Sequence, residues 1–516
     1  MAPTQLTREL IPILVVLSLA IFVIRRRFFH TLSKYPGPLI NSLTDVPAAF
    51  HLARGTQQFY YKALHEKYGP VVRVAPNELS FINAQAWDDI YGFRRPAPNM
   101  EKSPVFIGAV AKAPDGSMGI SMAPLATKDH ARQRGAMAYC FTNQALLQQQ
   151  SLMKVHIDKL ISQLKKMTRQ GEAVDMSSWY TYTTFDLMGD LTFGKPFGCL
   201  DQGAATDWST AIINVFISGA WEQAIRRIAG VGNWLSLRLT QLLVPKEAAR
   251  WRQLHFLKSR ETTVARLADG ALRNHPDVIY QIIKNKESRN SLTDTEIIIN
   301  MVLFISAGSE TTAGTLTAWT YFYCTQAKAR RRLIQEVRES GLFKSEADII
   351  WDNVGPDKLP YLDATINEAL RLFSPAAASQ QRVVPKGGAI VDGNYLPEGV
   401  CVAIPPYGCT RLPCNFKDPD EFHPERWLSD PKYADDRLDA SQPFSVGPRV
   451  CIGKNLAYFE LRLILVHMLW NFDLELECGF LGKQTEKAWG DGMKHIKGYL
   501  TWMKPPLWVR LKEAQH

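Results

Sequence analysis

The residues from Phe444 to Gly453, FSVGPRVCIG, carry the clearest chemistry in the sequence, because they present Cys451 between two glycines. Gly447 and Gly453 would let the backbone approach a flat ligand where a side chain would collide. Arg449 could pair through its planar guanidinium with an acidic group on that ligand. Helical apolar spacing follows, so the sulfur would lie just before a helix N-terminus, which favours an anion. The segment indicates a loop that presents a thiolate to iron, although a lone cysteine is more often a buried structural residue.

The spacing F-x-x-G-x-R-x-C-x-G, which begins at Phe444, resembles the haem-binding signature of the cytochrome P-450 family. The resemblance implies haem b (iron protoporphyrin IX) as the cofactor and Cys451 as the axial ligand of its iron. Such a thiolate pushes electron density into the iron and favours cleavage of the O–O bond. Phe444, Gly447, Arg449 and Gly453 are then cofactor-binding residues.

A second informative stretch is AGSETT, residues 307–312, in the middle of a long apolar segment. The spacing predicts a helix over 296–325, and Thr293 with Glu296 forms a capping box at its start. A glycine inside a helix costs about 1 kcal/mol relative to alanine, so Gly308 favours either close packing or a local opening of the helix. A mid-helix threonine such as Thr311 usually bonds back to the carbonyl four residues earlier.

AGSETT also resembles the oxygen-handling motif of the same family. The resemblance implies that Thr311 supplies a hydroxyl beside dioxygen and that Glu310 is the acid that relays protons to it. It implies further that Ala307 and Gly308 leave room for dioxygen above the ring, and that Phe304 faces the substrate.

Three basic residues match positions that grip the haem propionates in the family. His130 and Arg134 are four residues apart and would share one helix face, although spacing alone favours an exposed basic helix about equally. His130 stands where the family has tryptophan, so it keeps a ring N–H donor and adds a possible charge. Arg382, in SQQRVVPKGG, matches the third position.

Glu368 and Arg371, in INEALRLFSP, are three residues apart on a predicted helix. Such a pair is usually a solvated ion pair worth about a few tenths of a kcal/mol. It also matches the E-x-x-R of the family, and FHPERW (422–427) matches a downstream element that contains Arg426. The resemblance implies that the three residues form a buried network that locks the cysteine loop.

The stretch 96–125 is rich in Pro, Gly, Ser and Met and lacks a clean period, which is typical of functional loops. In the family this loop covers the substrate, although any one of its apolar residues is more often packed locally. The small residues 376–378 indicate a roomy pocket wall. The candidate substrate contacts are Phe106, Ile107, Met118, Ile120 and Ala377.

The rest of the sequence favours one catalytic domain, residues 34–516, behind a membrane anchor, residues 1–33. The apolar run 10–24 is followed by three arginines, which predicts a single-pass anchor with the domain on the cytosolic face of the endoplasmic reticulum. A secretory signal is the alternative. Scattered cysteines fit a reducing compartment, and the net charge of +10 fits a membrane surface or an acidic partner. No nucleic-acid-binding module is recognisable, so we expect no nucleic-acid partner.

The resemblance implies a mainly α fold with small β-sheets, the cytochrome P-450 fold, and an NADPH-dependent monooxygenase. We expect hydroxylation or epoxidation of a small lipophilic molecule, because the sequence looks most like fungal secondary-metabolism enzymes such as trichothecene hydroxylases. Terpenoids, polyketides and alkaloids are the expected substrate classes. No dinucleotide fingerprint is present, so electrons should come from NADPH-cytochrome P-450 reductase, with cytochrome b5 as a further candidate partner.

Three alternatives stay open from the sequence. The same fold could desaturate a substrate, couple phenols or rearrange a ring without leaving oxygen in the product. The chain could instead be a non-catalytic haem-binding protein. A cysteine-nucleophile hydrolase is the third alternative, but no histidine partner motif for Cys451 is recognisable.

Overall fold

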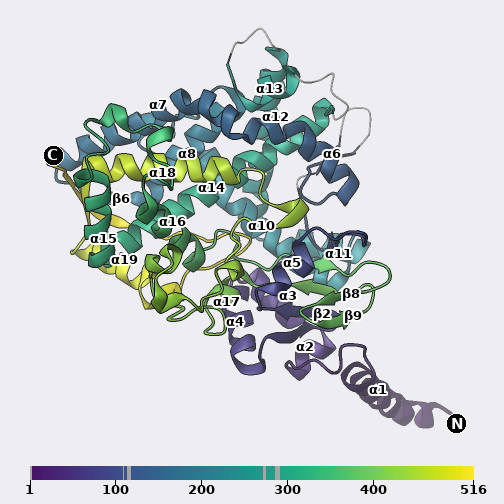
Figure 1. Ribbon diagram of the computed structural model, residues 1–516. Helices are drawn as coiled ribbons and strands as arrows, with labels where there is room; N and C mark the ends of the chain where they lie inside the picture. The colour runs from purple at the N-terminus through teal and green to yellow at the C-terminus, as the bar shows by residue number, and fades with distance from the viewer. Residues whose placement is uncertain (1–2, 109, 113–117, 271–274, 285–290, 516) are drawn as a thin grey trace.

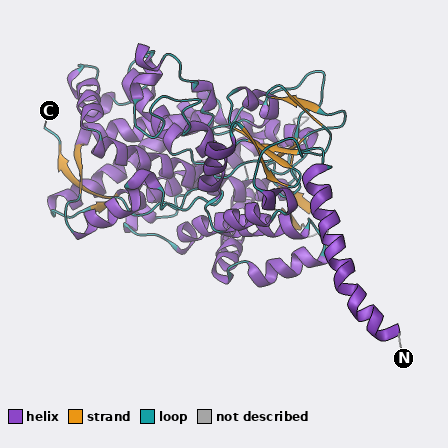
Figure 2. Ribbon diagram, turned by 90° about the horizontal axis from the view of Figure 1, so that it is seen from below, coloured by secondary structure: helices purple, strands orange, loops and turns teal. Residues whose placement is uncertain are grey.

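The computed structural model describes residues 3–108, 110–112, 118–270, 275–284 and 291–515. Helices make up most of the body, and several of the small sheets gather near the end from which the N-terminal helix projects (Figures 1 and 2). This arrangement agrees with the mainly α fold expected from the sequence.

The α-helices are spread along the whole chain, with short helical turns between some of them. In order they are α1 Pro3–Phe28, α2 Leu39–Leu43, α3 Val46–Ala53, α4 Gln57–Tyr68, α5 Gln85–Tyr91, α6 Thr127–Met137, α7 Asn143–Arg169, α8 Met176–Phe193, α9 Cys199–Gln202, α10 Asp207–Ala229, α11 Trp234–Leu243, α12 Lys246–Ala268, α13 Val278–Lys284, α14 Asp294–Thr325, α15 Ala327–Ile334, α16 Pro360–Leu372, α17 Pro406–Thr410, α18 Lys454–Asn471 and α19 Phe480–Trp489.

The strands are short and form small, separate sheets. They are β1 Val71–Ala75, β2 Glu78–Phe81, β3 Glu101–Lys102, β4 Val110–Lys112, β5 Met118–Ile120, β6 Val174–Asp175, β7 Arg382–Val383, β8 Ala389–Val391, β9 Asn394–Leu396, β10 Cys401–Ala403, β11 Phe472–Leu476 and β12 Trp508–Glu513. The largest sheet has the order β1-β2-β10-β7-β3, and β11-β12-β6 forms a second one. The stretch 96–125, expected to be a loop, therefore contains three short strands, because β3 pairs with β7 and β4 pairs with β5.

Two helices organise the core, α14 and α18. The capping box predicted at the start of α14 is present, since Thr293 and Glu296 bond reciprocally. Glu296 also pairs with Arg132 of α6, which fixes the start of α14 against that helix. Most of α14 is buried against α8, α12 and α18, and most of α18 is buried as well. The apolar stretches of α14 and α18 are thus core helices that are covered on several sides.

The N-terminal helix α1 projects away from the body in both views (Figures 1 and 2). Its apolar side chains from Ile11 to Ile24 are largely exposed, and the carbonyl of Arg26 near its end accepts a hydrogen bond from Arg73 of β1 at 3.2 Å. In the described part of the chain one helix meets a length-and-hydropathy criterion for a membrane span, and it is α14 rather than α1. The apolar window of α14 is 72% buried inside the protein, as expected for a core helix.

Candidate functional site

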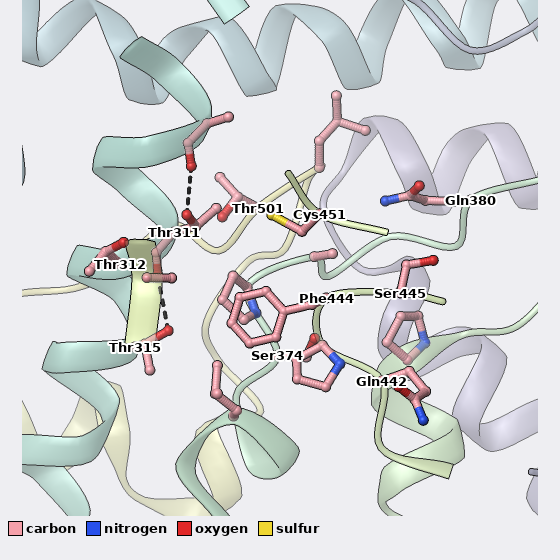
Figure 3. A pocket seen from close by; sticks show the side chains of 18 of the residues that line it. Thr311, Thr312, Thr315, Ser374, Gln380, Gln442, Phe444, Ser445, Cys451 and Thr501 are labelled. Atoms are coloured by element: carbon pink, nitrogen blue, oxygen red, sulfur yellow. Dashed lines mark hydrogen bonds between the residues drawn. The ribbon is translucent and has the colours of Figure 1, made fainter. Parts of the chain in front are cut away.

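A cavity of about 300 Å³ lies between α14 and the loop that precedes α18. Cys451 and Phe444 enter it from the loop, and Thr311 enters it from α14 (Figure 3). Ala307 of α14 also lines it. The structure therefore brings together two motifs that lie far apart in the sequence. The apolar part of the lining comes from several elements and includes Phe216, Leu370, Ile404, Leu461 and Leu500.

The cysteine loop holds its sulfur at the cavity by backbone bonds. The N–H of Cys451 donates to the carbonyl of Phe444 at 2.9 Å, and α18 begins three residues after the sulfur, at Lys454. Burial raises the pKa of the Cys451 thiol, while the N–H of Gly453 and the charges of Arg134 and Lys454 lower it. None of these three groups is a general base, so the surroundings do not resemble those of a cysteine nucleophile.

The two glycines of the loop have different surroundings. Gly447 has φ +70°, and a Cβ there would lie 2.2 Å from the carbonyl oxygen of Tyr91. Its requirement for glycine therefore comes from the backbone of α5, not from a flat ligand. Gly453 has open space where a Cβ would stand, as expected for a position that leaves room beside the sulfur.

On α14, Ala307 and Thr311 line the cavity, whereas Gly308 and Phe304, which were expected there, are not part of its lining. Gly308 faces α8, because a Cβ there would lie 2.5 Å from the sulfur of Met188, so close helix packing explains this glycine. Phe304 is buried and packs edge-on against Phe141 at 5.4 Å, and it is not part of the lining. The Thr311 hydroxyl donates to the carbonyl of Ala307 at 2.6 Å (Figure 3), as isolated mid-helix threonines do.

Glu310 does not line the cavity either. One of its carboxylate oxygens is ion-paired with Lys504, from the chain after the last core helices, and both side chains are at most 2% exposed. Its other oxygen has no hydrogen-bond partner among the residues that the structure describes. The sequence motif gave no sign of Lys504, because nothing in its local context marks a lysine that reaches a helix almost 200 residues earlier.

Two arginines lie at the cysteine loop: Arg449 belongs to it, and Arg134 contacts it from α6. Arg134 donates to the carbonyl of Val450, directly before Cys451, at 2.7 Å. Arg449 lines the cavity and pairs with Glu101 at 3.1 Å, but its Nη1 is buried and has no partner in the described part of the chain. Arg134 is thus hydrogen-bonded to the loop backbone, whereas Arg449 has one N–H donor group that is unused within the described residues.

Three further basic residues surround Arg449. Lys102 of β3 lies directly opposite Arg382 of β7 in the antiparallel strand register. The pKa of Lys102 is lowered mainly by burial and to a smaller extent by the charges of Arg382 and Arg449. Burial also lowers the pKa of Arg382, to about 10. Burial and the same cations lower the pKa of His130 to about 3, so this histidine is neutral at physiological pH and is an uncharged ring donor. Sequence reasoning missed Lys102, whose position depends on the strand pairing.

This cluster fits a dianionic ligand edge such as two carboxylates. Lys102, Arg134, Arg382 and Arg449 all lie close enough to act on His130, and within the described residues Glu101 is the one carboxylate that pairs with any of them. Buried cations depress each other's pKa unless anions neutralise them. Together with the orphan Nη1 of Arg449 and the thiol in the cavity, the donor set fits haem b with its two propionates.

The buried network expected around Glu368 is present. Glu368 accepts both donors of a bidentate Arg371 at 2.7 and 2.9 Å and the Nε of Arg426 at 3.1 Å. Trp427 Nε1 and the backbone N–H of His423 complete its shell, both at 2.9 Å. Burial alone would raise the pKa of Glu368, but Arg371 and Arg426 lower it.

The network does not touch Cys451 directly. Arg371 donates to the carbonyls of Thr410, Pro419 and Glu421, and Arg426 also pairs with Asp436. These contacts fix the segment 410–436, which leads into the cysteine loop. Asp436, which sequence reasoning missed, supplies the second carboxylate and balances the two arginines.

None of the candidate substrate contacts that the structure describes is part of the cavity lining. Phe106 lies under the ammonium group of Lys102 at 3.9 Å, and Ile107 lies near Gly219 of α10. Ala377 is buried beside Gly498, and its neighbour Ala376 lines the cavity instead. Ile120 bonds through its carbonyl to Gln133 of α6. The side chain of Met118 lies outside the described residues.

Comparisons with known proteins agree with these features. The cytochrome P-450 family model matches residues 36–500. The chain is 59% identical to the cytochrome P-450 monooxygenase abl2 of Leptosphaeria maculans, over 97% of this chain and 91% of that protein. It is 55% identical to aba2 of Botryotinia fuckeliana (98% and 94% covered) and 37% identical to astA of Talaromyces wortmannii (94% and 93%). The chain therefore belongs to the cytochrome P-450 family and is a monooxygenase of the fungal secondary-metabolism kind.

Proposed function

We propose that this monooxygenase binds haem b through Cys451 and inserts one atom of dioxygen into a small lipophilic molecule, by hydroxylation or epoxidation. The observation that carries the proposal is the cavity itself, where a thiol, an α14 hydroxyl and an unbalanced cationic cluster meet. When bound, haem would supply the iron centre at which dioxygen is reduced. Arg449, Arg382 and His130 would hold its propionates, with Lys102 adding charge beside them.

The residues of α14 have distinct tasks in this proposal. Thr311 offers its hydroxyl to the cavity, and Ala307 keeps the neighbouring space open. Glu310 acts as a proton-relaying acid, and in this structure it is ion-paired with Lys504. The aliphatic and aromatic lining supports a lipophilic substrate, and a terpenoid, polyketide or alkaloid would suit it.

The proposed electron source is NADPH through a cytochrome P-450 reductase, with cytochrome b5 as a further partner. Lys128 of α6 and Lys454 of α18 are exposed on the side of the cysteine loop and could meet an acidic docking face. Arg132 is less suitable, because it is paired with Glu296.

The proposed location is the endoplasmic reticulum membrane, with α1 as a single-pass anchor and the catalytic domain, 34–516, on the cytosolic face. The projecting α1 supports it, because exposed apolar side chains are followed by Arg25, Arg26 and Arg27. Helix α11 adds a second apolar surface, with Trp234, Leu237 and Leu242 at 75%, 60% and 76% exposure.

The test uses membranes that carry the full chain and a fungal reductase, supplied with NADPH, heavy-isotope dioxygen and candidate lipophilic metabolites. A new product that carries heavy oxygen and disappears in Cys451→Ala is the expected result. A Cys451-dependent product without heavy oxygen would replace insertion by desaturation, coupling or rearrangement. A reduced protein without the carbon monoxide difference band of a haem thiolate would overturn the proposed ligand.

A further inference from the structure

A second cavity, of about 700 Å³, lies between α10, α19 and the chain segment 495–505. We call it the outer cavity, and it shares no lining residue with the cavity at Cys451. Its inner wall is apolar, since Ile496 and Tyr499 are buried and Ile217 and Met503 are half-buried. The other lining residues are Gln484, Lys487, Ala488, His495, Lys497 and Pro505. An apolar wall with a few polar groups at its rim is typical of small-molecule sites.

The rim of the outer cavity is cationic. Lys487 and Lys497 are exposed there, and neither forms an ion pair within the described residues. His495 also lines the rim and lies 3.9 Å from Asp491. Among the residues that the structure describes, no aspartate or glutamate lines this cavity. Two lysines without a carboxylate beside an apolar wall favour a ligand that has one anionic group.

The outer cavity and the cavity at Cys451 are lined by neighbouring residues of the same two segments. On α10, Ile217 lines the outer cavity and Phe216 lines the cavity at Cys451. Near the C-terminus, Tyr499 lines the outer cavity, whereas Leu500 and Thr501 line the cavity at Cys451 (Figure 3). A ligand in the outer cavity would therefore contact the segments that form the substrate wall without occupying the substrate space.

The second of these segments is a turn that is closed by backbone bonds. The N–H of Met503 donates to the carbonyl of Lys497 at 2.8 Å, and Gly498 and Trp502 form a β-bridge. Because these bonds join the two ends of the turn, contacts of a ligand with Lys497 and Met503 would restrict the position of Leu500 at its tip. The turn thus connects the two cavities mechanically.

We propose that the outer cavity binds a fatty acid, with its aliphatic chain against Ile217, Ile496 and Met503 and its carboxylate at the rim formed by Lys487 and Lys497. The lysines are point charges that suit a single carboxylate, and the wall accepts a hydrocarbon chain. Binding holds the turn 497–503 in one position and so restricts which molecules the cavity at Cys451 accepts. The effect on substrate choice rests on the proposed function, whereas the binding does not.

The first test measures binding without activity, by equilibrium dialysis of radiolabelled decanoate against the full-length protein in nanodiscs, with empty nanodiscs subtracted. Binding should saturate, and Lys487→Gln together with Lys497→Gln should weaken it about tenfold. Lys483→Gln together with Lys512→Gln is the matched control, since it removes two exposed charges that do not line the outer cavity. An equal loss in both double variants would refute the site, because net charge alone would then explain the attraction.

A neutral probe tests whether the carboxylate matters. Methyl decanoate has the same chain without the charge, so it should bind about tenfold more weakly than decanoate. Equal binding of the two probes would contradict the proposal and assign the outer cavity to neutral lipophilic molecules.

A steric variant keeps the proposal testable if the charge changes alter the fold. Ala488 is half-buried on α19 and lines the outer cavity, so Ala488→Phe should fill it and abolish decanoate binding. The denaturation midpoint of this variant should equal that of the wild type. Wild-type binding of decanoate by a folded Ala488→Phe protein would exclude this cavity as the site.

Hydrogen exchange and product analysis test the connection between the cavities. Decanoate should slow amide exchange in 497–503 of the wild type but not of Ala488→Phe, and it should change the product ratio of the haem-loaded enzyme only in the wild type. Slowed exchange around Ala307 that persists in Ala488→Phe would place decanoate at Cys451 and overturn the proposal. An unchanged product ratio would refute the control of substrate choice. Absence of any product would refute the proposed function, and the dialysis result would still decide on the fatty-acid site.

Discussion

Two charged clusters flank the cysteine loop, and they differ in how their charges are balanced. Around Glu368, two arginines face two carboxylates, and the oxygens of Glu368 accept five hydrogen bonds. Around Arg449, the cations outnumber the one carboxylate that pairs with them, and a guanidinium nitrogen has no partner, as far as the described residues go. The first cluster is complete by itself, as expected of a structural element, and the second is complete only with an anionic ligand.

The largest expected effect comes from breaking the balanced cluster. Arg371→Ala should leave Glu368 buried and charged, which costs roughly 3–5 kcal/mol in the free energy of unfolding. Chemical denaturation and the haem content of the purified protein measure the result. A haem-loaded Arg371→Ala protein of wild-type stability would show that the network does not support the cysteine loop.

A change in the unbalanced cluster should act in opposite directions on the empty protein and on haem binding. Lys102→Met removes a buried cation that Arg382 and Arg449 repel, so the apoprotein should become more stable. Haem affinity should fall about tenfold, because one charged partner of the propionates is lost. Denaturation of the apoprotein and haem titration give the two values, and Lys128→Met on the exposed face of α6 is the matched control. If Lys102→Met lowered both the stability of the apoprotein and the haem affinity, Lys102 would only support the fold.

A smaller effect should appear as a pH dependence of the apoprotein. The pKa of His130 falls from 6.5 to about 3 on folding, so the folded state binds fewer protons between these values. Stability should therefore decrease as pH falls below about 6.5, and it should be unaffected by this residue above that pH. His130→Gln should flatten the decrease, and bound haem should do so as well, since propionates favour the charged ring. Denaturation midpoints are measured across this pH range for the wild-type apoprotein, the His130→Gln apoprotein and the haem-bound wild type. Equal pH slopes in these three samples would contradict the assignment.

The smallest effect should come from an ion pair outside both clusters. Arg169 pairs with Glu513 at 2.8 Å, with side chains 70% and 39% exposed. Arg169→Ala should leave the denaturation midpoint and haem content unchanged, because solvent screens such a pair. A large loss of stability or haem content in Arg169→Ala would show that the contrast between the two clusters does not depend on burial.

The sequence predicted the residues within each motif better than the contacts between motifs. The capping box of α14, the Glu368–Arg371 pair and the position of Cys451 before a helix all depend on local spacing, and the structure contains them. Lys504 and Lys102 were missed because their partners are brought close by tertiary packing and strand pairing. Gly308 and Phe304 were assigned to the cavity because a motif names residues but does not say which side of the helix each one faces.

The close approach of Gly308 to Met188 has a consequence for how related enzymes can diverge. A methyl group at Gly308 would require the Met188 side chain of α8 to move, so α14 packs closely against α8 beside the cavity. The other walls come from independent segments: Phe216 from α10, Ala376 after α16 and Leu500 near the C-terminal strands. Changes in these segments can alter which molecules enter without moving Ala307 or Thr311. Exchange of these segments with a relative should therefore transfer its product pattern, while the oxygen-handling side stays the same.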